Sequence, residues 1–106
     1  MTIIHFVLKG KWYRMIESLE KPEEYRDITE YWQKRLEPAI KALAAGETPI
    51  ARFYHGYKPD RPHMDFEIKA IWTGIGHPKW GAESGVPYYI IELGKRLPVH
   101  AVHGSL

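Results

Sequence analysis

Hydrophobic residues change their spacing several times along this chain, and each change predicts the boundary of a helix or strand. The apolar, β-branched run Thr2–Leu8 predicts a strand in the interior of a sheet, with both faces covered. After it, apolar side chains recur at helical spacing between charged ones: Trp12, Met15, Ile16 and Leu19. This pattern predicts an amphipathic helix of roughly two to three turns. Because proline disfavours helical geometry in the residue before it, Pro22 predicts that the helix ends close to Glu20.

The next segment predicts a short extended piece and two further helices. Residues Glu23–Ile28 form the extended piece, and Thr29 can cap a helix that carries Tyr31, Trp32 and Arg35. Pro38 fits the first turn of another helix, which Gly46 ends. The buried stripe of that helix is predicted to consist of Ile40, Leu43 and Ala44.

Strand patterns dominate the second half of the chain. Residues Pro49–Tyr57 predict a strand followed by a turn-rich loop at 58–62. In Met64–Thr73, apolar residues alternate with mostly charged ones, so one face of that strand should be apolar through Trp72. A glycine-rich loop at 74–81 precedes a last strand, Pro87–Leu93, which Gly94 should close. Strands therefore outnumber helices here, which favours an α+β or small barrel architecture.

Length and composition indicate one small domain. The 106 residues are 44% hydrophobic, which suits a single core over residues 1–97 with a poorly anchored tail at 98–106. The sequence contains no cysteine, which excludes disulfide scaffolds and thiol catalysis. The apolar run Ile3–Leu8 is far shorter than the ~20 residues that span a bilayer. We therefore expect no membrane partner and a cytoplasmic protein.

The overall charge is too small to identify a partner. Fifteen Lys and Arg against thirteen Asp and Glu give a net charge of +2. Nucleic-acid binding would therefore need a local patch. The six histidines contain no H-E-x-x-H pattern, so we expect neither a metal nor a cofactor.

The segment Lys21-x-x-Glu24-x-Arg26 brings charges of both signs together. On an extended strand, residues two apart share a face, so Glu24 and Arg26 should point the same way while Lys21 reaches over them from the turn. Such a cluster could hold a phosphate or a base edge, with Glu24 orienting the two cations or moving a proton. The alternative is an exposed strip of ion pairs that contributes under about 1 kcal/mol.

This segment resembles the signature G-x-K-x-x-E-x-R of ASCH domains, relatives of the RNA-binding PUA fold. Leu19 stands where that signature has glycine. Further blocks, which together cover most of residues 3 to 97, are similar to the small phage and bacterial ASCH proteins: residues 31–36, 53–57, 76–82 and 89–94.

The resemblance implies a PUA-like, small open β-barrel flanked by two or three helices, with a cleft beside the signature. It also implies binding of RNA or of a modified nucleoside. Some members hydrolyse N4-acetylcytidine with a lysine, a threonine and a glutamate, and others are ribonucleases. Lys21 matches the lysine, Glu24 occupies the threonine position, and Glu83 is the acidic residue in the comparable loop. Because the hydroxyl is lost, we expect binding, with hydrolysis at the same cleft as the alternative.

Four more residues are candidates for ligand binding. Arg52 shares a strand face with Ile50 and Tyr54, and either points into the cleft or pairs with Glu24 or Glu67. Tyr57 and Lys58 suit base stacking with a phosphate contact, or form an ordinary hairpin loop. Trp80, in the glycine-rich loop, either covers a base or plugs the end of the barrel.

Overall fold

The computed structural model describes residues 1–57 and 60–98. Along the chain the elements are β1 (Ile3–Leu8), α1 (Gly10–Glu17), β2 (Glu23–Arg26), α2 (Glu30–Ala44), β3 (Ile50–His55), β4 (His63–Ile75), the 3-10 turn η1 (Pro78–Trp80) and β5 (Pro87–Leu97). Residues 99–106 of the predicted tail lie outside the described residues.

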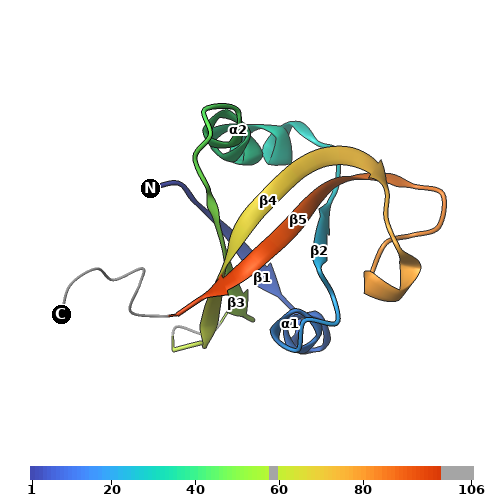
Figure 1. Ribbon diagram of the computed structural model, residues 1–106. Coiled ribbons are helices and arrows are strands. Elements are labelled where there is room, and N and C mark those ends of the chain that lie inside the picture. The colour runs from blue at the N-terminus through green and yellow to red at the C-terminus, as the bar shows by residue number, and fades with distance from the viewer. Residues whose placement is uncertain (58–59, 99–106) are drawn as a thin grey trace.

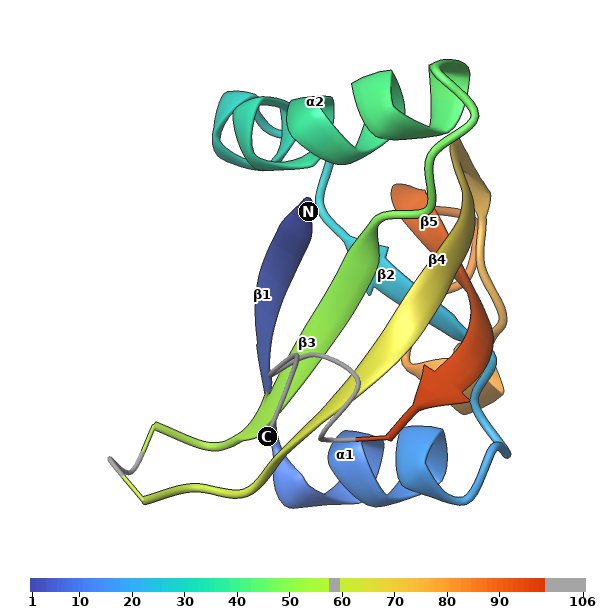
Figure 2. The same cartoon turned by 60° about the vertical axis from the view of Figure 1, so that its left-hand side comes forward.

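One five-stranded sheet, in the order β1-β3-β4-β5-β2, curls into a half-barrel (Figure 1). The two helices lie at its opposite ends (Figure 2). β1 runs parallel to β3, and the other neighbours are antiparallel. The α+β class is therefore confirmed. The interior position predicted for the first strand is wrong, because β1 forms one edge of the sheet and β2 the other.

The curl of the sheet coincides with irregular pairing between β4 and β5. The register shifts between Phe66 and Ile68 and again between Ile68 and Ala70. Bulges of this kind bend a strand and move later side chains to the other face. Consequently Ile71 packs against the core, whereas Trp72 is 40% exposed. The prediction of one unbroken apolar face through Trp72 is wrong for this reason. β5 also continues through Gly94 to Leu97 instead of ending there.

The helices differ from prediction in two places. α1 ends at Glu17, and Leu19 lies beyond it, exposed and with φ 69°. α2 is one helix that contains Pro38, where two helices were expected. Its buried residues are Leu36, Ala39 and Ala42. Of the predicted stripe, Leu43 packs against the core, whereas Ile40 and Ala44 are exposed, so the prediction is wrong for those two residues.

The core fills the concave side of the sheet. The rings of Phe6 and Phe53 stack with centroids 5.3 Å apart, and Phe66 meets Phe53 edge-on at 6.1 Å. Trp32 of α2 stacks on Phe6 at 5.6 Å and covers this end of the core. Each fully buried phenylalanine stabilises the fold by roughly 1.5–3 kcal/mol. Within the described part of the chain, no helix combines the length and apolar character that crossing a bilayer requires.

Candidate functional site

The turn after α1 positions Lys21. Backbone N–H groups close the helix end: that of Ser18 donates to the carbonyl of Arg14, and that of Leu19 to the carbonyl of Ile16, both at 3.0 Å. Leu19 adopts the left-handed conformation that glycine favours, at the position where the ASCH signature has glycine. The chain then reverses, and the N–H of Lys21 donates to the carbonyl of Met15 at 2.9 Å. Lys21 therefore lies two residues before β2 with its side chain turned inward, 2% exposed.

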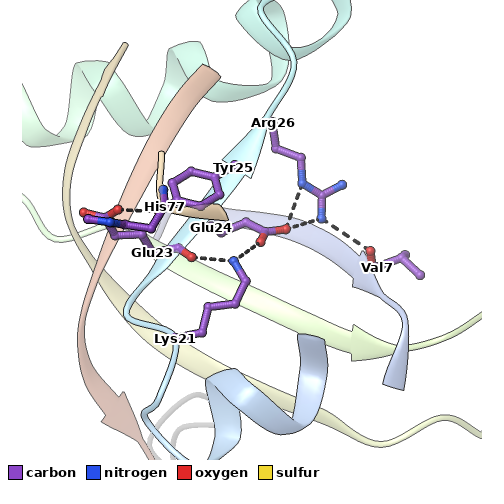
Figure 3. Close-up of polar contacts among 7 residues, drawn as sticks. All are labelled: Val7, Lys21, Glu23, Glu24, Tyr25, Arg26 and His77. Atoms are coloured by element: carbon purple, nitrogen blue, oxygen red, sulfur yellow. Dashed lines mark hydrogen bonds and ion pairs between the residues drawn. The ribbon is translucent and has the colours of Figure 1, made fainter. Parts of the chain in front are cut away.

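Lys21, Glu24 and Arg26 form one hydrogen-bonded group, called here the charged trio (Figure 3). Lys21 Nζ donates to Glu24 Oε1 at 2.9 Å and to the carbonyl oxygen of Glu23. Arg26 donates from Nη2 and Nε to Glu24 Oε2, at 2.6 and 3.0 Å. Glu24 is buried, so the exposed ion-pair strip considered above is ruled out. Two cations share one carboxylate, which leaves the trio with a net charge of +1.

Arg26 also connects the two edges of the half-barrel. Its Nη2 donates to the carbonyl oxygen of Val7 on β1 at 3.3 Å. The guanidinium lies over the rings of Phe6 and Trp32, with its central carbon 5.1 and 4.8 Å from their centroids. Stacking on two rings and three hydrogen bonds fix the guanidinium in place.

A cavity of about 250 Å³ opens beside the trio, between β1 and β2, and is called here the seam cavity. Its lining consists of Val7, Leu8, Lys9, Trp12, Lys21, Glu24, Tyr25, Arg26, Trp80 and Gly81. Three aromatic side chains therefore face a space that contains three cations and one carboxylate. A Cβ on Gly81, whose φ is 103°, would lie 3.2 Å from the Trp12 ring, so glycine lets this loop approach Trp12 closely.

Tyr25 is held firmly as one wall of the seam cavity. Its hydroxyl donates to Glu23 Oε1 at 2.7 Å and accepts from the backbone N–H of His77 at 3.1 Å. Burial, together with the neighbouring Glu23 carboxylate, raises the pKa of the Tyr25 hydroxyl well above its usual value. Lys21 Nζ lies 4.9 Å from the ring centroid, which is cation–π distance. A Cβ on Gly76 would come within 2.7 Å of the ring, so this glycine is needed for the wall.

The remaining predicted site residues separate into different places. Trp80 lines the seam cavity. Arg52 does not, because strand alternation turns it to the outer face of β3, where it pairs with Asp65 at 2.8 and 3.0 Å. Glu83 is exposed and is not among the lining residues of the seam cavity. Tyr57 lines a neighbouring hollow. Lys58 lies outside the described residues.

Among the lining residues that the sequence did not predict, three carry an aromatic ring or a charge: Lys9, Trp12 and Tyr25. The sequence predicts Trp12 only as part of a helix stripe, and it does not predict Lys9 as a site residue. Tyr25 lies within the predicted extended piece and was not predicted as a site residue. Its position between two residues of the signature could have pointed to it.

The chain matches no family model and no curated protein. Its resemblance to ASCH domains therefore stays a prediction.

Proposed function

We propose that this protein is a PUA-like, ASCH-type domain that binds RNA or a modified nucleoside, with one pyrimidine-sized base entering the seam cavity. The observation that carries the proposal is the convergence of the charged trio and three aromatic walls on one solvent-accessible space of about 250 Å³. That volume lies just below the usual range for drug-sized ligands, roughly 300–1,000 Å³, and suits a smaller one.

The trio is suited to a ligand that accepts hydrogen bonds. An ammonium group has three hydrogens, and Lys21 uses two of them on Glu23 and Glu24. The third is available to a base carbonyl or a phosphate oxygen. The net positive charge favours either acceptor. The rings of Trp12, Tyr25 and Trp80 offer flat apolar surfaces on which a base can stack.

The same contacts favour binding over hydrolysis. Lys21 Nζ is already held by the Glu23 carbonyl and the Glu24 carboxylate, and no scissile bond is positioned by these contacts. Both oxygens of Glu24 already accept from the trio's cations. Glu83, the residue matched to the family glutamate, does not line the cavity. Hydrolysis of N4-acetylcytidine or RNA would require these groups to rearrange.

The experiment compares ligand binding by Lys21→Met and Lys69→Met. Both substitutions remove one positive charge, but Lys69 is exposed and pairs with Glu92 at 3.6 Å. Cytidine, N4-acetylcytidine and oligocytidine are titrated calorimetrically, and mass spectrometry identifies small molecules that copurify with each protein. A hydrogen bond to a charged group contributes about 1.5–3 kcal/mol, so Lys21→Met should bind at least about tenfold more weakly. Equal affinity in a folded Lys21→Met protein would contradict the proposal.

A further inference from the structure

A second hollow, of about 700 Å³, adjoins the seam cavity. Its lining includes Leu8, Lys9, His55, Tyr57, Asp60 and Arg61. Leu8 and Lys9 line both spaces. A smaller hollow of about 370 Å³ is lined by Val7, Leu8, Lys9, Gly56 and Tyr57, and so lies between them. The three spaces therefore follow one another along the end of β1.

The backbone that lines these three spaces, at the ends of β1 and β3, is held by hydrogen bonding and stacking. The backbone N–H of Gly56 donates to the carbonyl of Leu8 at 3.0 Å, which ties the end of β1 to the end of β3. At a strand rise of about 3.3 Å per residue, Val7 to Lys9 spans roughly 7 Å. The imidazole of His55 stacks on Tyr13 of α1 at 4.9 Å, which supports the second hollow from below.

The second hollow has the chemistry of a nucleotide site. Tyr57 is 84% exposed, so one face of its ring is open to stacking. Arg61 also lines the hollow, and its guanidinium lies 4.1 Å from the ring of Tyr54, a residue outside that lining. Lys9 stands between the two spaces and belongs to both. A cation placed between two stacking sites matches a phosphate that links two bases.

We infer that the ligand of this protein is single-stranded RNA and that the protein holds two successive nucleotides, one in the seam cavity and the next in the second hollow. The phosphate between them lies near Lys9, and the second base stacks on Tyr57. This inference rests on the proposed function, because the seam cavity must bind the first nucleotide. The inference adds to the proposed function that an RNA strand binds more tightly than a single nucleotide does.

The test measures affinity for cytidine monophosphate and for tetracytidylate RNA. The wild-type protein should bind the tetranucleotide roughly tenfold or more tightly than the monophosphate, as one extra stacked base predicts. The double variant Tyr57→Ala, Arg61→Gln should lose this gain and bind the monophosphate as the wild type does. A matched control is Tyr31→Ala, Arg35→Gln, because Tyr31 is also exposed and Arg35 also lies over a tyrosine ring, at 4.5 Å. The control should keep the full gain.

The outcomes separate the two proposals. If both ligands bind with equal affinity, or if the double variant keeps the gain, the two-nucleotide inference is wrong while the proposed function stands. If neither ligand binds to the wild-type protein, the proposed function fails and the inference fails with it. If the control loses the gain as well, the effect comes from overall charge, and the second hollow is not the site.

Discussion

Two partly buried guanidinium–carboxylate pairs stand on opposite faces of the same sheet, and the pair at the seam lines the seam cavity. At the seam, the side chains of Arg26 and Glu24 are 19% and 6% exposed; on the outer face, those of Arg52 and Asp65 are 16% and 4% exposed. The burial is nearly the same. The seam pair has a second cation, Lys21, which is 2% exposed, whereas Arg52 and Asp65 balance each other.

The comparison separates a structural ion pair from one with binding capacity. Asp65 accepts two hydrogen bonds from one arginine and raises the pKa of Arg52 further above its usual value. That pair neutralises itself. In the charged trio, one carboxylate serves two cations, so part of the positive charge is left for a ligand. The excess of charge beside a cavity, and not burial, distinguishes the candidate site.

The largest expected effect concerns stability. Glu24→Gln should lower the free energy of unfolding by about 3–5 kcal/mol, because it leaves two cations, one of them fully buried, without a counterion. Asp65→Asn should lower the free energy of unfolding by less, because it leaves only Arg52 without a counterion and Arg52 is partly exposed to water. Urea denaturation of both variants checks this order. Glu30→Gln, which affects an exposed pair with Lys34, serves as the control and should change little. An equal loss of unfolding free energy in Glu24→Gln and Asp65→Asn would show that the second cation of the trio adds nothing to the effect.

Arg26→Lys and Arg52→Lys test whether the seam pair contacts the ligand. Each replaces a guanidinium, which bonds through two nitrogens, by a point charge. Arg26→Lys should weaken cytidine binding about tenfold, equivalent to about 1.4 kcal/mol. Arg52→Lys should leave it unchanged. Calorimetric titration gives both values, and a similar loss in the two variants would remove the distinction between the faces.

Leu19→Gly should stabilise the turn that delivers Lys21. A left-handed non-glycine residue costs about 1–2 kcal/mol, part of which is offset by the greater flexibility of glycine in the unfolded chain. We expect a net gain of up to about 1 kcal/mol in urea denaturation, because Leu19 is 67% exposed and loses little burial. Leu19→Ala shortens the side chain without relieving the backbone, so it should not stabilise. Stabilisation by both would point to the side chain instead.

The two faces should also respond to opposite ends of the pH scale. Partial burial, aided by Arg52, lowers the pKa of His5 on the outer face below 6.5. As pH falls below 6.5, the unfolded chain therefore takes up a proton that folded His5 resists, and stability falls. At the seam, the raised pKa of Tyr25 means that the unfolded chain ionises first above pH 10, so stability falls as pH rises.

Urea denaturation across pH checks both directions. His5→Asn should flatten the acid side of the stability profile. Tyr25→Phe should reduce the alkaline slope without abolishing it, because burial also raises the pKa of Tyr13. If His5→Asn changed the alkaline side of the profile, or Tyr25→Phe the acid side, the assignment of these two residues would be wrong.

Local patterns predicted the strands and the charged trio well. Alternation along β2 was enough to place Glu24 and Arg26 together, because neighbours two apart share a face whatever the rest of the fold does. The two-residue rule fails beyond Ile68 in β4, because bulges there change which side chains face the core. The local sequence contains no residue that predicts these bulges. The edge position of β1 depends on which strands pair, and nothing within Thr2–Leu8 encodes that choice.

Long-range packing explains the other differences between the predicted and the observed structure. Arg52 pairs with Asp65 because β3 and β4 align these residues, and that register is set by the whole hairpin. The seam cavity needs Trp12, Tyr25 and Trp80, which come from three separate segments. Pro38 looked like a helix start, but α2 tolerates it within one continuous helix whose buried side packs on the sheet.

The bond from Arg26 to Val7 joins the two free edges of the half-barrel through a side chain that also faces the seam cavity. A ligand that recruits this guanidinium competes with, or shares, the contact that holds those edges together. Binding of such a ligand would then be coupled to the strength of this contact between β1 and β2. Amide exchange at the end of β1 would report the direction of that coupling without any label on the ligand.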